Sequence, residues 1–105
     1  MELMEFGGRL AELRIIKNVS AREMSLTIGQ SANYINKIEN GVTLPSMAAF
    51  FDICDYLGIE PKDFFDRDKS NPSMVNEMLS YYIRLDNTAQ LQVAGIVKGL
   101  AHRPK

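Results

Sequence analysis

Hydrophobic residues recur along the chain at intervals of three and four, which is the spacing of one face of an α-helix. No stretch of the sequence alternates strictly between apolar and polar residues, as a half-buried strand does. The pattern therefore predicts an all-α protein. We expect helices at about 6–17, 21–28 and 32–40, a fourth between Ser46 and Gly58, a short fifth from Pro61, and two more beyond residue 73.

The inward positions of the first five helices predict one hydrophobic core, because their apolar residues fall on single helical faces. Cys54 lies within the stripe of the fourth helix, so we expect its thiol to be buried and unreactive. The predicted core residues are Phe6, Leu10, Leu13, Ile16, Ile35, Ile38, Phe50, Ile53, Cys54, Leu57, Phe64 and Phe65.

Polar residues at the helix ends match known capping patterns. Ser20 and Glu23 form a capping box at the start of the second helix, and Ser31 is expected to cap the third. Gly41 can end the third helix in the left-handed conformation, and Asn87 is expected to cap the last helix together with Gln90.

A polar run from Asp66 to Ser73 is the strongest boundary signal in the chain. It predicts one domain at residues 1–66 and a helical extension at residues 67–105. The two helices of the extension carry wide apolar stripes. They must either fold back on the first domain or pack against a partner.

Composition and charge exclude several classes of function. Twelve basic and thirteen acidic residues give a net charge of −1, so gross charge does not indicate a polyanion partner. A single cysteine and His102 are too few for a disulfide framework or a typical zinc site. The sequence has no phosphate-binding loop and no nucleophile–base set, so we expect no enzyme, metal or cofactor. It has no membrane-length apolar run and no export signal at its start, which favours the cytoplasm.

Two short helices joined by a turn containing Gly29 predict a helix-turn-helix. The run from Tyr34 to Gly41 (YINKIENG) is the most specific part of a wider pattern that includes Leu44-Pro45-Ser46 and Leu57-Gly58-Ile59. Over about residues 6–66, this pattern resembles the Cro/C1-type (XRE-like) family of DNA-binding regulators.

The resemblance implies a five-helix, lambda-repressor-like domain whose third helix lies in the major groove, in a dimer on double-stranded DNA. It implies an ion pair between Arg14 and Glu39. By position, it makes four residues base-reading: Ala32, Asn33, Asn36 and Lys37. Contacts to the DNA backbone are expected from Arg9, Lys17, Ser31, Asn40 and Thr43.

The sequence departs from the family at three positions in the helix-turn-helix. Family members often carry Gln where this chain has Ala21 and Ala32, and a small apolar residue where it has Ser25. The loop at residues 41–44, often basic in the family, carries no charge, and residues 1–44 hold five basic and five acidic residues. We therefore expect weaker DNA binding, or greater dependence on dimerisation, than in a basic member.

The extension resembles the helical tail of many repressors in this family, where it commonly supports dimerisation. The expected dimerisation residues are Met78, Tyr82, Val93, Ile96, Val97 and Leu100. The function implied is that of a dimeric repressor that occupies an operator. The alternative is a protein-interaction module on the same fold, such as an antitoxin or a regulator whose C-terminal helices bind a protein antagonist.

Overall fold

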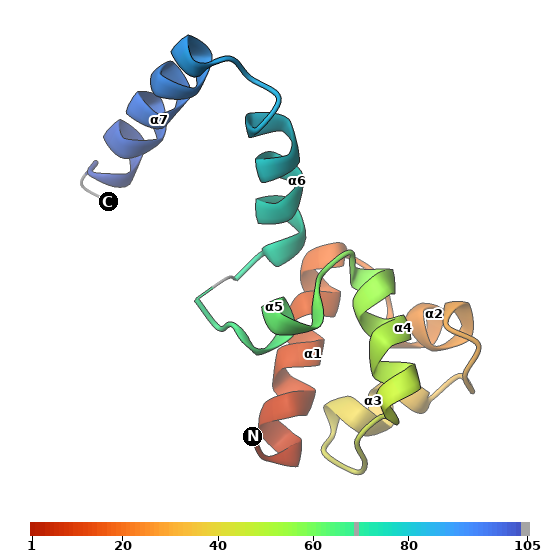
Figure 1. Cartoon of the computed structure of the whole chain (residues 1–105). Helices are drawn as coiled ribbons and strands as arrows, with labels where there is room; N and C mark the ends of the chain where they lie inside the picture. The colour runs from red at the N-terminus through yellow and green to blue at the C-terminus, as the bar shows by residue number, and fades with distance from the viewer. Residues whose placement is uncertain (69, 104–105) are drawn as a thin grey trace. The chain divides into compact units, whose positions relative to one another are not determined.

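A computed structural model describes residues 1–68 and 70–103. These residues form α-helices joined by turns and short loops (Figure 1). The described residues contain seven helices and no strand, as the hydrophobic pattern predicts. The helices are α1 (Leu3–Lys17), α2 (Ala21–Thr27), α3 (Tyr34–Glu39), α4 (Met47–Leu57), α5 (Pro61–Phe65), α6 (Pro72–Tyr82) and α7 (Asn87–Ala101).

The chain divides into two compact units, Met1–Ser73 and Met74–Lys105. The polar run at residues 66–73, which we expected to begin the extension, lies with the first unit. Hydrogen bonds to α1 join it to this unit: Nη2 of Arg9 donates to the carbonyl of Asp66 at 2.9 Å, and Nη2 of Arg67 donates to the carbonyl of Glu5 at 3.2 Å. Pro72, the first residue of α6, is also buried.

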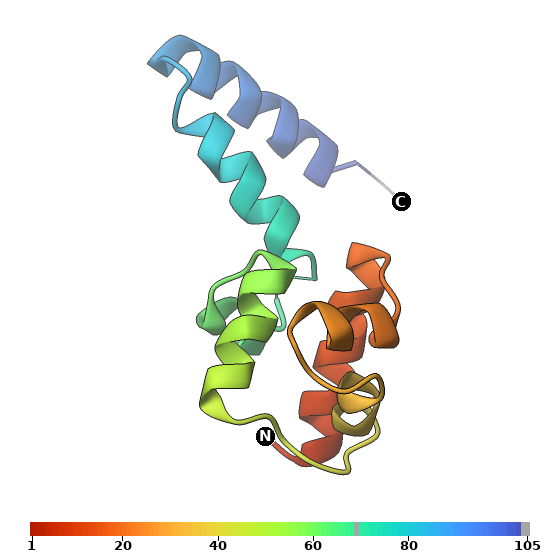
Figure 2. The same ribbon diagram turned by 90° about the vertical axis from the view of Figure 1, so that its right-hand side faces the viewer.

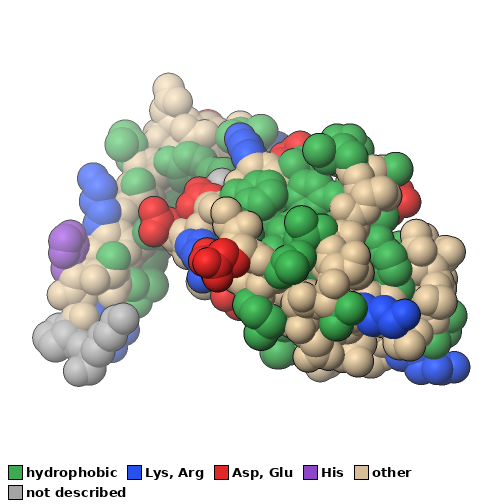
Figure 3. Space-filling model, turned by 90° about the horizontal axis from the view of Figure 1, so that it is seen from below, with side chains coloured by type: hydrophobic (Ala, Val, Ile, Leu, Met, Phe, Trp, Pro, Cys, Tyr) green, Lys and Arg blue, Asp and Glu red, His purple; other side chains and the backbone are tan. Residues whose placement is uncertain are grey.

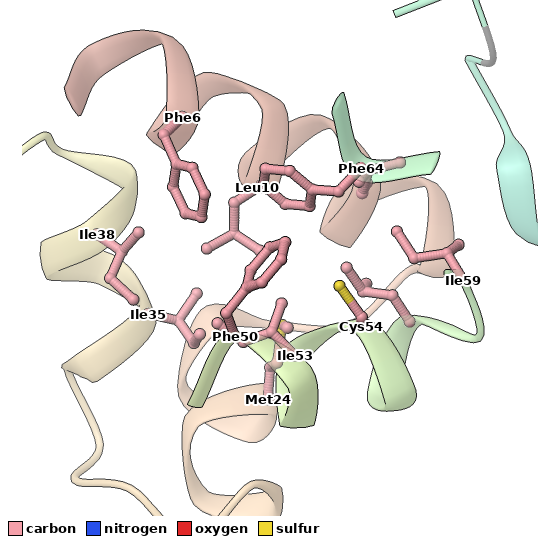
Figure 4. Close-up of a cluster of buried hydrophobic side chains, with 12 residues drawn as sticks. Phe6, Leu10, Met24, Ile35, Ile38, Phe50, Ile53, Cys54, Ile59 and Phe64 are labelled. Atoms are coloured by element: carbon pink, nitrogen blue, oxygen red, sulfur yellow. The ribbon is translucent and has the colours of Figure 1, made fainter. Parts of the chain in front are cut away.

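The core of the first unit is built by one face of each of its five helices (Figure 4). Phenylalanine rings fill its centre, with Phe6 and Phe64 at a centroid distance of 4.6 Å and Phe50 and Phe64 at 5.2 Å. Cys54 is buried among them, and burial raises the pKa of its thiol to about 11. The thiol is therefore protonated at neutral pH, as expected for an unreactive cysteine.

Two predicted core residues lie at the surface instead. Ile16 is 42% exposed and Phe65 is 51% exposed. The expected stripe of α1 is correct as far as Leu13, and Ile16 lies in the last turn of the helix, after its last buried residue. Phe64 and Phe65 are adjacent on a five-residue helix, so only one of them can point into the core.

The helix ends follow the sequence at some positions and differ at others. The hydroxyl of Ser20 accepts from the N–H of Glu23 at 3.0 Å. Ser31 does not cap α3, because residues 32 and 33 form a turn and the N-cap residue is Asn33. Likewise the cap of α7 is Asp86, whose carboxylate accepts from the N–H of Ala89 at 2.8 Å, and not Asn87.

Helices α1 and α3 approach each other closely at Gly7, and both views of the ribbon show them side by side (Figures 1 and 2). A Cβ atom placed on Gly7 would lie 2.6 Å from the carbonyl oxygen of Glu39 and closer still to that of Ile38. The glycine therefore sets the distance between the first helix and the end of α3.

In the second unit, helices α6 and α7 are joined by a turn at residues 83–86. Two hydrogen bonds close this turn: the hydroxyl of Tyr82 donates to the carbonyl of Gln90, and Nε2 of Gln90 donates to the carbonyl of Tyr82. Beyond the turn the apolar side chains of both helices are largely exposed. Those more than half exposed are Met74, Met78, Leu79, Tyr81, Leu91, Ile96, Val97 and Leu100, and Ile83 in the turn is 72% exposed.

Candidate nucleic-acid interface

Helix α3 presents one apolar side to the core and one polar side to solvent. Ile35 and Ile38 are fully buried, and Figure 4 shows both pointing into the core from α3. Asn36 and Lys37, between them in sequence, are exposed. The two isoleucines fix the rotation of the helix about its axis, so the polar residues are held facing outward.

Ser25 ties α3 to the preceding helix, a role that the sequence analysis did not assign. Its side chain is fully buried, and the hydroxyl donates to the carbonyl of Ala21 at 2.7 Å. The same oxygen accepts from the N–H of Ile35 at 3.0 Å, which satisfies one of the free donors at the start of α3. The signal that could have revealed it is a serine on the inward face of a short helix, where a buried hydroxyl needs a partner.

Three of the expected contact residues lie in the turn that leads into α3. The N–H of Tyr34 donates to the carbonyl of Ser31 at 3.0 Å, so Ser31, Ala32 and Asn33 precede the helix. Ser31 and Asn33 are exposed, and Ala32 is half-buried. The structure therefore brings Asn33 next to α3, but at its entrance and not on its body.

The residues that follow the helix remain close to it. Nδ2 of Asn40 donates to Oδ1 of Asn36 at 3.1 Å, and the N–H of Val42 donates to the carbonyl of Lys37 at 2.9 Å. Thr43 is exposed in the connector between α3 and α4. Lys17 lies at the end of α1, with its ammonium 5.7 Å from the ring centre of Tyr56.

Residues 7–69 match the family described as helix-turn-helix domain. This match covers more than half of the chain, and it decides the family. The chain belongs to the helix-turn-helix domain family, of the Cro/C1 type. The predicted all-α fold, with this domain followed by C-terminal helices, is confirmed. Neither a curated protein nor a solved structure matches the chain.

The helix-turn-helix domain contains the ion pair that the family pattern implies. Nε of Arg14 donates to Oε2 of Glu39 at 2.7 Å, and Nη2 donates to Oε1 at 2.9 Å. Nη1 of Arg14 also donates to the carbonyl of Val19. The hydrogen bonds with Glu39 raise the pKa of Arg14, so its guanidinium stays charged. The pair joins α1 to the end of α3.

Arg9 cannot contact the DNA backbone, and this prediction was wrong. Its side chain is fully buried. Nε donates to the carbonyl of Phe64 at 2.6 Å, and Nη2 donates to the carbonyls of Asp63 and Asp66 at 2.8 and 2.9 Å. Arg9 therefore caps the C-terminal end of α5 and joins it to α1.

The chemistry of the described residues is that of a binding domain. The helix-turn-helix family binds DNA and is typically non-catalytic. Within residues 1–68 and 70–103, no group of three or more His, Cys, Asp and Glu side chains is arranged to hold a metal ion. No helix in that part of the chain is both long and apolar enough to cross a membrane.

Proposed function

We propose that the chain is a sequence-specific transcription regulator that reads operator DNA with α3 and acts as a dimeric repressor in the cytoplasm. The observation that carries the proposal is the rigid presentation of α3. Ile35 and Ile38 lock its inner side into the core, and Asn36 and Lys37 face solvent. A repressor of this kind acts by occupying its site, so no catalytic group is needed.

The outward side chains have the donors and acceptors that base reading requires. An asparagine can bond both N6 and N7 of adenine, and a lysine can donate to guanine. Asn36 keeps this capacity although Asn40 donates to its Oδ1, because a carbonyl oxygen has two lone pairs. Asn33 can act in the same way from the entrance of the helix, and the methyl group of Ala32 can contact thymine.

The charge near α3 supports a modest electrostatic contribution to binding. Of the five basic residues in 1–44, Arg9 is buried and Arg14 is paired with Glu39. Lys17, Arg22 and Lys37 remain exposed. Each phosphate neutralised contributes roughly 0.9 to the salt slope, so we expect a slope well below that of a basic regulator.

The first test is the binding of operator and scrambled DNA, using an operator selected from genomic fragments with the purified protein. Asn33→Ala and Lys37→Ala are each expected to weaken operator binding by about 1–3 kcal/mol and to change scrambled binding little. The side chain of Asn33 makes no capping hydrogen bond, so its loss leaves α3 intact. Lys17→Ala should weaken both complexes and reduce the salt slope by about 1.

The control is Lys62→Ala, which removes an exposed lysine from α5, outside α2, α3 and the turn between them. It should leave the ratio of operator to scrambled affinity unchanged. If Asn33→Ala and Lys37→Ala also leave this ratio unchanged, α3 does not read bases, and the interpretation as a protein-interaction module takes precedence.

We assign dimerisation to the second unit because its apolar surface is uncovered within one chain. Two helices of this length bury too little surface to be stable alone. Pairing with a second copy would produce a four-helix bundle that covers both stripes. The residues proposed to take part are Met78, Tyr82, Val93, Ile96, Val97 and Leu100, of which Tyr82 and Val93 are half-buried and the rest exposed.

The second test measures self-association by sedimentation of the full chain. Ile96→Glu is expected to shift the protein toward monomer, because a charge at the dimer interface must be desolvated without a partner. Lys98→Glu places the same group on the opposite side of α7 and should leave the association constant nearly unchanged. A wild-type protein that sediments as a monomer would contradict the dimer. It would favour the alternative, in which α6 and α7 bind a protein antagonist.

A further inference from the structure

A cavity of about 310 Å³ opens on the first unit, near the start of α1, the connector between α3 and α4, and the end of α5. Its volume reaches the lower end of the range for small-molecule sites, about 300–1,000 Å³. Figure 3 views the chain from below, and hydrophobic side chains gather on this face of the first unit. We propose that the cavity binds a small uncharged aromatic molecule, and that its occupancy changes the affinity for DNA.

Phenylalanine rings form the inner wall of the cavity. Phe6, Phe50 and Phe65 line it, with centroid distances of 5.8 Å between Phe6 and Phe50, and 5.6 Å between Phe50 and Phe65. Phe6 and Phe50 are held in the core, so this wall exists before a ligand arrives. Aromatic rings favour offset or edge-to-face contacts with another ring, which gives an aromatic ligand an advantage over an aliphatic one.

The remaining wall is apolar and adaptable. Met1 and Met47 line the mouth and are both mostly exposed, and methionine side chains readily adjust to an aromatic guest. Every residue that the structure places around the cavity is apolar. These side chains offer no partner to a charged group, which favours an uncharged ligand.

The cavity is joined to the proposed DNA-reading helix through the connector. Leu44 and Pro45 line the cavity, and Thr43 is their neighbour in sequence. The N–H of Val42 donates to the carbonyl of Lys37, the basic residue of α3. A ligand against Leu44 would restrict this connector and so alter the position of Thr43, one of the residues expected to contact the DNA backbone. This second half of the proposal rests on the proposed function.

Indole is the probe, added to the full chain labelled with ¹⁵N and followed by amide NMR shifts. We expect saturable shifts at residues 42–44, at residues 46–47 and around Phe65. Phe65→Ala should weaken the binding of indole at least fivefold, whereas Phe51→Ala should weaken it less than twofold. The two phenylalanines are matched, because they are 51% and 49% exposed and only Phe65 lines the cavity. Leu44→Ser, in the exposed connector, is a second variant. It should weaken the binding of indole and keep the wild-type amide shifts outside the connector.

The proposed site would be overturned by amide shifts confined to α6 and α7, or by an equal affinity of Phe65→Ala and wild type for indole. The coupling is measured separately, as the affinity for selected operator DNA with and without saturating indole. The coupling is supported if indole changes the operator affinity at least threefold in the wild type but not in Phe65→Ala. An unchanged operator affinity in the wild type overturns it. If the protein binds no DNA at all, the proposed function fails, and the indole site is still decided by the NMR titration.

Discussion

Replacement of Gly7 by alanine is expected to lower the free energy of unfolding by about 3 kcal/mol. The new Cβ would meet the carbonyl oxygens of Ile38 and Glu39, which are backbone atoms at the end of α3 and have no alternative rotamer. Relief requires α1 to move away from α3. That shift would also stretch the hydrogen bonds between Arg14 and Glu39, at 2.7 and 2.9 Å. Thermal or urea denaturation of the full chain measures the effect.

The adjacent glycine supplies the control for this experiment. Gly8 lies in the same helix, and a Cβ atom at its position meets nothing within 4 Å. Gly8→Ala should therefore raise stability by up to about 1 kcal/mol, because alanine is the better helix former. Equal effects of the two substitutions would show that the approach of α1 to α3 is looser than the structure indicates.

Arg9→Met is expected to have an effect of similar size for a different reason. Methionine keeps most of the side-chain volume but removes every donor of the guanidinium. The carbonyls of Asp63, Phe64 and Asp66 would then lose the bonds that Arg9 makes to them. A hydrogen bond that involves a charged group contributes about 1.5–3 kcal/mol, so the loss of these bonds is expected to cost about 3 kcal/mol or more. Chemical denaturation with tyrosine fluorescence measures it.

Arg67→Met is the matched substitution at the surface. Arg67 also donates to a backbone carbonyl, that of Glu5, but its side chain is exposed and water can replace the bond. Its removal should leave the denaturation midpoint nearly unchanged. If Arg9→Met unfolds at the same midpoint as the wild type, then Arg9 does not anchor α5 and the description of its role is wrong.

The difference between Arg9 and Arg14 shows how far the sequence can predict such a site. The hydrophobic spacing was enough for the helices and most of the core, because burial of one helical face is a local property. The Arg14–Glu39 pair came from the family pattern. Arg9 was assigned to the DNA backbone by position, through the same resemblance. Glu12 of the same helix accepts from its Nη1, but the carbonyls of Asp63, Phe64 and Asp66 lie more than fifty residues away and come within reach only after the fold has formed.

The start of α3 was misjudged for a related reason. Serine before an apolar run is a common helix signal, so Ser31 was expected to cap the helix. In the fold, the donor at Ile35 is satisfied by Ser25 of the preceding helix, and α3 begins at Tyr34. The competing partner is ten residues away and on another element, so helix signals confined to one segment could not reveal it.

Because Cys54 is buried, the reactivity of its thiol reports the opening of the first unit. The thiol of Cys54 is enclosed and protonated, so a disulfide reagent can reach it only when α4 separates from its neighbours. The rate of thiol exchange, followed against reagent concentration, then reports how often this unit opens under native conditions. The second unit contains no cysteine and therefore contributes nothing to the measured thiol exchange. Thiol exchange can thus measure the rate of opening of the first unit in the unmodified full chain, separately from any self-association through the second unit.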